Sequence, residues 1–148
     1  MSPTDIPLIV LPLWILLAAF VFCTLFWKYV KVQAGIAITA VSLYLVAAVT
    51  LLLAVDQQGI LVVQVGDWPA PFGITLVADL FAAIMLVISA IVAFAVLLYS
   101  FQDIPDALRQ KGFYPVLLVM MFGVSGSFLT GDIFNLYVWF EVMLVASF

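Results

Sequence analysis

The sequence predicts an all-α, polytopic helical membrane protein that forms a single membrane domain over residues 1–148. Hydrophobic residues make up 68% of the chain and charged residues only 8%, too few to build the surface of a water-soluble domain. The mean hydropathy is +1.39. Long apolar runs alternate with short segments that carry most of the charges, as expected of a chain that crosses a bilayer several times.

Five apolar runs are candidate transmembrane helices. A helix needs about 20 residues to cross about 30 Å of hydrocarbon. Four runs meet or nearly meet this length, and a fifth begins but ends before it is complete. They are residues 6–27, 34–55, 76–101, 113–129 and 133–148. The first run follows no basic segment and precedes no small-residue cleavage pattern, so we interpret it as a retained helix rather than a signal peptide.

The four basic residues predict the orientation of the chain. Lys28 and Lys31 lie between the first and second runs, and Arg109 and Lys111 lie between the third and fourth. The positive-inside rule places both loops in the cytoplasm and the N-terminus outside. Aromatic residues fall near both predicted boundaries, as in aromatic belts. Those near the inner boundary are Trp27, Tyr29, Tyr99 and Tyr114, and the one near the outer boundary is Trp68.

The connection between the second and third helices is not an ordinary polar loop. Residues 60–65 are rich in β-branched side chains, and Gly66 and Asp67 can turn the chain. We expect a short external β-hairpin with an apolar face. Such a face would pack on neighbouring helices, on another subunit or on the rest of its own protein.

The composition argues against several classes of function. The chain has no histidine and a single cysteine, Cys23, within an apolar run, so we expect no metal, haem or disulfide. It shows no basic patch for nucleic acid, no set of catalytic side chains and no phosphate or dinucleotide motif. We therefore expect a protein that is not an enzyme by itself and that binds no cofactor and no nucleic acid.

Glu141 is the main candidate functional residue. It follows Asp132, at the start of the fifth run, by nine positions, which places it about 13 Å below the outer boundary and close to the midplane. A carboxylate at this depth either keeps its proton or pairs with a cation from another helix. We interpret Glu141 as a proton-transfer group; the alternative is a protonated glutamate that only holds helices together.

Three other side chains are candidates for an accessory proton path. Asp132 is expected to cap the fifth helix or to admit protons at its outer end. Tyr137 lies one turn before Glu141 on the same face, where it could hydrogen-bond to the glutamate or fill a helix interface. Asp79, about one turn inside the third helix, could point outward, pair across helices or line a polar path.

The fourth run carries a cluster of small residues within the stretch "GVSGSFLTG". Small side chains allow a second helix to approach closely. We expect this surface to be a helix interface, with an ion-lining role for its serines as the less favoured alternative. The residues are Gly123, Ser125, Gly126 and Ser127.

Three segments also carry a family likeness. The segments "GDWPAPFGITLVADLFAAIM", "VLLYSF" and above all "FLTGDIFNLYVWFEVMLVASF" resemble the N-terminal part of the D subunit of Mrp-type multisubunit sodium/proton antiporters. That protein is similar to the antiporter-like, proton-pumping subunits of respiratory complex I and of membrane-bound hydrogenases. The resemblance implies a fold of about fourteen transmembrane helices with two inverted repeats and a broken helix in each.

The resemblance also implies a role for Glu141. It matches the family's glutamate that pairs with a lysine on a later, broken helix and passes protons to further lysines. This sequence has no lysine within an apolar run. We therefore expect the chain to be the N-terminal fragment of a larger antiporter-like subunit.

These observations lead to one leading hypothesis and two others. The leading hypothesis is a membrane subunit of a Na+/H+ antiporter complex. We expect it in the cell membrane, namely a bacterial inner membrane. Its expected partners are lipid, the other subunits, protons and sodium. The alternative is a proton-pumping membrane subunit of an NADH–quinone oxidoreductase or a membrane-bound hydrogenase. The third is a truncated structural remnant without transport of its own.

Overall fold

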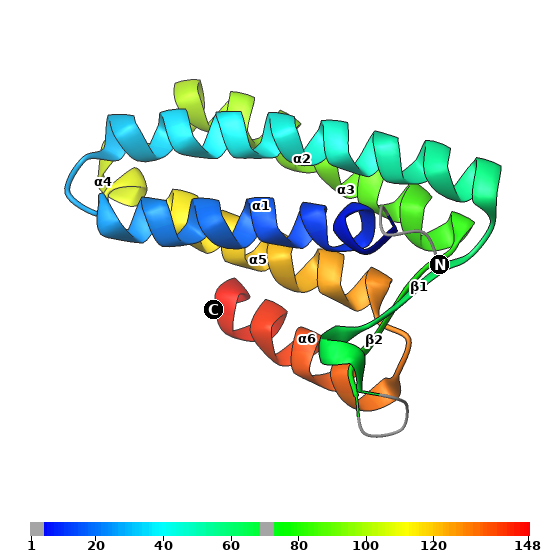
Figure 1. Cartoon of the computed structure of the whole chain (residues 1–148). Helices are drawn as coiled ribbons and strands as arrows, with labels where there is room; N and C mark the ends of the chain where they lie inside the picture. Colours follow the sequence, from blue (N-terminus) through cyan, green and yellow to red (C-terminus); the bar gives the residue numbers. More distant parts are fainter. Residues whose placement is uncertain (1–4, 69–72) are drawn as a thin grey trace.

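The computed structural model describes residues 5–68 and 73–148, and in this part of the chain five apolar helices pack into a bundle (Figure 1). Three of the described helices are long and apolar enough to cross a membrane, and two apolar helices are shorter. The long ones are α1 (Asp5–Leu25), α2 (Val30–Gln58) and α3 (Leu80–Asp103). The shorter ones are α5 (Phe113–Leu129) and α6 (Ile133–Ser147). A single turn, α4 (Asp106–Arg109), precedes α5.

The predicted start of the third helix at residue 76 is wrong. Strand β2 (Thr75–Ala78) occupies these positions, and α3 begins only at Leu80. The extended segment ends at Asp79, whose side chain accepts a hydrogen bond from the Ala82 N–H and so starts the helix. Hydropathy alone did not separate strand from helix here, because "TLVA" is as apolar as the helix that follows it.

Strand β2 pairs with strand β1 (Leu61–Gln64) in an antiparallel two-stranded sheet, with Leu61 opposite Ala78 and Gln64 opposite Thr75. One face of this sheet is buried, since Leu61, Val63, Leu76 and Ala78 join an apolar cluster with residues of α1, α2 and α3. A 3-10 turn, η1 (Val65–Asp67), follows β1, with Gly66 at a φ of 72°. Residues 69–72, in the same predicted connection, lie outside the described residues.

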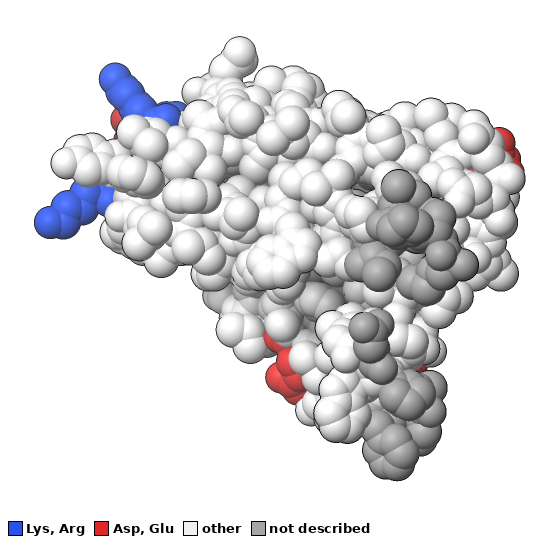
Figure 2. All heavy atoms as spheres, viewed as in Figure 1, with Lys and Arg blue, Asp and Glu red and all other residues white. Residues whose placement is uncertain are grey.

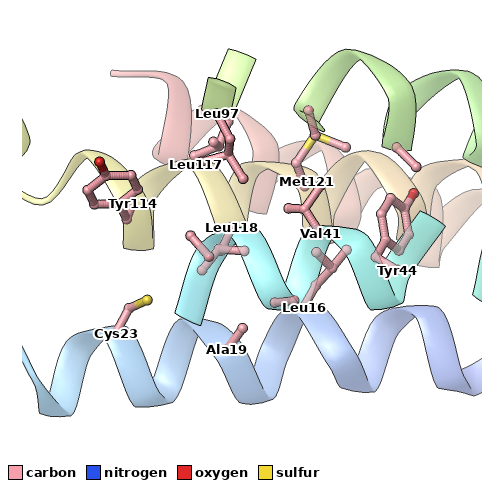
Figure 3. Close-up of a cluster of buried hydrophobic side chains, with 14 residues drawn as sticks. Leu16, Ala19, Cys23, Val41, Tyr44, Leu97, Tyr114, Leu117, Leu118 and Met121 are labelled. Carbon is pink, nitrogen blue, oxygen red and sulfur yellow. The ribbon is translucent and has the colours of Figure 1, made fainter. Parts of the chain in front are cut away.

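The main core lies between α1, α2, α3 and α5 (Figure 3). Its largest buried side chains include Leu16, Tyr44, Leu97 and Tyr114. Tyr114 is completely buried within the bundle, unlike the other aromatic residues predicted near the inner boundary. Trp27, Tyr29 and Tyr99 are exposed. The difference arises because α5 runs through the centre of the bundle and contacts α1, α2, α3 and α6.

Helix α6 packs against α5 (Figure 1), and glycines of α5 lie at the contact. A Cβ atom built on Gly123 would lie 2.9 Å from the backbone nitrogen of Met143, and one built on Gly126 would overlap the ring of Trp139. The ring of Phe122 meets Trp139 edge to face, with 4.9 Å between centroids. The predicted helix interface at the small residues is confirmed, because only glycine leaves room for this approach.

Candidate functional site around Glu141

Glu141 lies on α6 beside a groove formed by α1, α5 and α6. The helix begins after its N-cap residue, Asp132, so Glu141 is about 13 Å along the helix axis from that end. The side chain is exposed at the surface of the described chain. The groove has a volume of about 490 Å³, and its other lining residues are apolar: Phe20, Val116, Val119, Val142, Val145 and Ala146.

Glu141 has no cationic partner within the described part of the chain. The only ion pair among residues 5–68 and 73–148 joins Arg109 to Asp106 at 2.6 Å. Figure 2 shows the lysine and arginine side chains gathered at one end of the bundle, where α1 passes into α2 and α4 precedes α5. We call this the basic end. Glu141 therefore lies away from every basic side chain of the described residues.

Tyr137 is the neighbour that the structure brings to Glu141. It lies one turn earlier on the same face of α6 and is 62% exposed. The same face carries further exposed apolar side chains, including Phe134 and Val145. This side of α6 therefore combines one proton-binding group with an apolar surface that no described residue covers.

Asp132 caps α6, as the sequence predicted. Its Oδ1 atom accepts a hydrogen bond of 2.6 Å from the Asn135 N–H. Its Oδ2 atom accepts a longer one, of 3.5 Å, from the Thr75 N–H of β2. The carboxylate thus connects the sheet to the start of α6, and it lies about 13 Å along the helix from Glu141.

The structure places Asp79 at the start of α3 rather than one turn inside it. Its Oδ1 atom accepts a hydrogen bond of 2.7 Å from the Ala82 N–H. The predicted depth was wrong because the preceding residues form a strand. The described structure therefore assigns this carboxylate a capping contact and does not bring it to Glu141.

The turn between α5 and α6 is fastened to β2. The Gly131 N–H donates to the Thr75 carbonyl at 2.8 Å, and Leu76 forms an isolated β-bridge with Thr130. The buried Asn135 donates from Nδ2 to the Thr130 hydroxyl at 2.9 Å. A Cβ atom on Gly131 would lie 2.5 Å from Val77 Cγ2, so glycine permits the close approach. These contacts fix where α6 begins and hence how far along the helix Glu141 lies from the sheet.

A buried polar pair in the bundle core was missed from the sequence. The Tyr44 hydroxyl of α2 lies 2.8 Å from the Ser125 hydroxyl of α5, and both residues are fully buried. Ser125 also donates to the Met121 carbonyl at 2.7 Å. Two signals could have found it: a tyrosine in the middle of an apolar run, and a serine within the small-residue stretch.

Metal ligands do not converge in the described structure. Within residues 5–68 and 73–148, no three His, Cys, Asp or Glu side chains come together in a group that could hold a metal ion. The single cysteine, Cys23, is buried and free.

Comparison with curated proteins finds relatives that are named as D subunits of cation/proton antiporters. The chain is 44% identical over 141 residues to the Na(+)/H(+) antiporter D subunit of Alkalihalophilus pseudofirmus, a match that covers 95% of this chain and 29% of the relative. It is 34% identical over 140 residues to the Na(+)/H(+) antiporter D subunit of Bacillus subtilis, covering 95% and 28%. A probable K(+)/H(+) antiporter D subunit of Rhizobium meliloti is 38% identical over 125 residues, covering 82% and 23%. No family model matches the sequence.

Comparison with solved structures finds similar chains, among them the following two. One belongs to the Mrp complex of Dietzia sp., with a TM-score of 0.81 and 26% identity, covering 99% of this chain and 27% of that one. The other belongs to the membrane-bound sulfane sulfur reductase, an archaeal respiratory membrane complex, with the same TM-score and identity and coverage of 99% and 29%. The chain therefore spans less than a third of the length of the proteins that it matches.

Proposed function

Because the chain is a homologue of the antiporter D subunits over 95% of its length, we propose that it forms part of a membrane complex that exchanges a monovalent cation for protons. The chain is an integral membrane protein, as its long apolar helices and its relatives agree. Sodium is the cation that we propose, since two of the relatives are named for it. The partners would be the other subunits of that complex.

The observation that carries this proposal is the position of Glu141 in an apolar groove with no cation nearby in the described chain. In that setting the carboxyl group would hold a proton until a positively charged side chain approaches. When a cation from another segment pairs with the carboxylate, the proton would be released. Tyr137, one turn earlier on the same face of α6, would hand protons to or from the carboxyl group.

We propose that α1, α2, α3, α5 and α6 cross or enter the bilayer with the basic end in the cytoplasm. All four basic residues lie at that end, in the turn after α1, the start of α2 and the loop around α4. The cytoplasmic side of membrane proteins is enriched in Lys and Arg. The N-terminus, the sheet and the α5–α6 turn would then face the outside of a bacterial inner membrane.

The test uses the complete antiporter complex reconstituted in vesicles, with cation-driven proton flux as the readout. Glu141→Gln keeps the size of the side chain and removes its titration, so we expect flux to fall to the background of empty vesicles. Glu141→Asp should retain part of the flux. Asp103→Asn, an exposed acid at the end of α3, is the matched control and should transport normally. Normal flux in the Glu141→Gln complex would remove this residue from the mechanism.

A second candidate function is a proton-pumping membrane subunit of a respiratory complex. It is favoured by the structural match to the sulfane sulfur reductase complex, which equals the Mrp match in TM-score. The two candidates differ in what drives the proton. Flux that requires a redox substrate and is indifferent to a sodium gradient would establish the second candidate, and sodium-driven flux without a redox substrate would establish the first.

A further inference from the structure

A pocket with a volume of about 560 Å³ lies at the basic end, away from Glu141. It is lined by residues 27–32, which join α1 to α2, and by Gln110 of the loop before α5. Lys28 and Lys31 are therefore the charged groups that line it, and no carboxylate does. Neither lysine forms an ion pair with any residue in the described ranges.

The pocket is held in shape by contacts that do not involve the lysines. The buried Gln33 donates from Nε2 to the Trp27 carbonyl at 2.8 Å and to the Phe26 carbonyl at 3.2 Å. A Cβ atom on Gly112 would lie 2.5 Å from the Trp27 ring, so the indole rests directly on the loop before α5. These contacts connect the two loops and orient Trp27 at the rim.

An apolar groove lies next to the pocket, between α1 and α2. It has a volume of about 690 Å³ and shares Val32 with the pocket. Its lining on α1 includes Ile15, Ala18 and Phe22, and its lining on α2 includes Gly35, Thr39 and Leu43. From Val32 to Leu43 the groove follows α2 for about 16 Å, which matches half of a hydrocarbon core about 30 Å thick. A cationic pocket and an apolar groove about one leaflet long thus meet at Val32.

We propose that the pocket and groove together bind one anionic phospholipid. The ammonium groups of Lys28 and Lys31 would contact the phosphate and the rest of an anionic head group, as basic pockets at the cytoplasmic side of membrane helices can do. The exposed rings of Trp27 and Tyr29 would lie at the level of the glycerol backbone, where amphipathic aromatic side chains are favoured. One acyl chain would occupy the groove. A free phosphate would use the pocket but not the groove.

The experiment measures lipid binding to the full 148-residue chain in detergent micelles by native mass spectrometry. The probes are palmitoyl-oleoyl phosphatidylglycerol and the phosphatidylcholine with the same chains. We expect the anionic lipid to bind about 25-fold more tightly, since each basic residue near an anionic lipid contributes about fivefold. The preference should disappear in the Lys28→Gln/Lys31→Gln double variant and persist in Lys28→Arg/Lys31→Arg.

Two further variants separate this site from general surface charge. Lys111→Gln removes a lysine from the same end but not from the pocket, so it should leave the preference unchanged. Gly35→Leu fills the groove at a position where a Cβ atom meets nothing within 4 Å, so it should weaken binding of both lipids and leave helicity by circular dichroism unchanged.

Three outcomes would overturn the proposal. They are equal binding of the two lipids by the unmodified chain, an equal loss in Lys111→Gln, and displacement of the lipid by inorganic phosphate at matched ionic strength, which would assign the pocket to a free anion. None of these measurements depends on Glu141 or on transport.

Discussion

The hydroxyl groups of Tyr44 and Ser125 lie 2.8 Å apart at the centre of the bundle, although 81 positions separate these residues in the sequence. The Tyr44 hydroxyl also lies 3.4 Å from the Leu86 carbonyl, so this side chain touches polar groups of both α3 and α5. The pair is surrounded by the apolar side chains of the main core. A hydrogen bond in such a place connects three helices that apolar packing alone would leave free to slide.

We expect Tyr44→Phe to lower the free energy of unfolding by about 1 kcal/mol, because the Ser125 hydroxyl loses one of its two hydrogen-bond partners while the packing stays almost the same. Unfolding of the reconstituted chain in a mixed-micelle SDS titration gives this value. Tyr99→Phe, an exposed tyrosine on α3, is the control and should change it little. If the effects of Tyr44→Phe and Ser125→Ala simply add in the double variant, the two hydroxyls do not interact.

Two glycine-to-alanine substitutions should have opposite effects on stability. Gly126→Ala places a methyl group where the Trp139 ring lies, so we expect a loss of about 1–3 kcal/mol from overpacking. Gly35→Ala places the same group in open space on α2 and should stabilise the chain by about 0.5–1 kcal/mol through helix propensity. The same SDS titration compares them. Equal effects would show that α6 does not rest on Gly126.

Substitutions at Asp132 separate capping from proton transfer. Asp132→Ala removes the acceptor for the Asn135 N–H and should destabilise the start of α6 by about 1 kcal/mol. Asp132→Asn keeps a good N-cap residue and removes only the acid, so we expect stability within a few tenths of a kcal/mol of the unmodified chain. The complete complex carrying Asp132→Asn should also retain its proton flux. Flux lost with stability retained would instead make Asp132 a proton-entry group.

The proposed orientation predicts which single cysteines a membrane-impermeant maleimide can label in intact cells. Cys23 is the only cysteine and is buried, so Cys23→Ala provides the background. A cysteine at exposed Gln58, at the end of α2, should react in intact cells. A cysteine at exposed Ala107, in α4, should react only after the cells are opened. The reverse pattern would place the basic end outside.

Five apolar helices could be located from the sequence, because a hydrophobic run is a local property that needs no knowledge of neighbours. The predicted helix beginning at residue 113 ends at Leu129 in the structure too, since Thr130 and Gly131 stop it. The wrong assignment of residues 76–78 to a helix arose because the prediction used only this local property. Apolar character is common to a buried strand and a membrane helix, and only pairing with Leu61–Gln64 decides between them.

The sequence by itself determined that the chain is a membrane protein, that its basic residues lie in two loops and that one glutamate stands deep within an apolar run. Tertiary structure alone decided that Asp79 is a cap, that Tyr114 is buried, that Tyr44 meets Ser125, and that the pocket lined by Lys28 and Lys31 lies beside an apolar groove. The physical reason is that these properties depend on interactions over different distances along the sequence. Hydropathy and charge act residue by residue along the chain, whereas burial and hydrogen bonding depend on which distant segments the packing brings together.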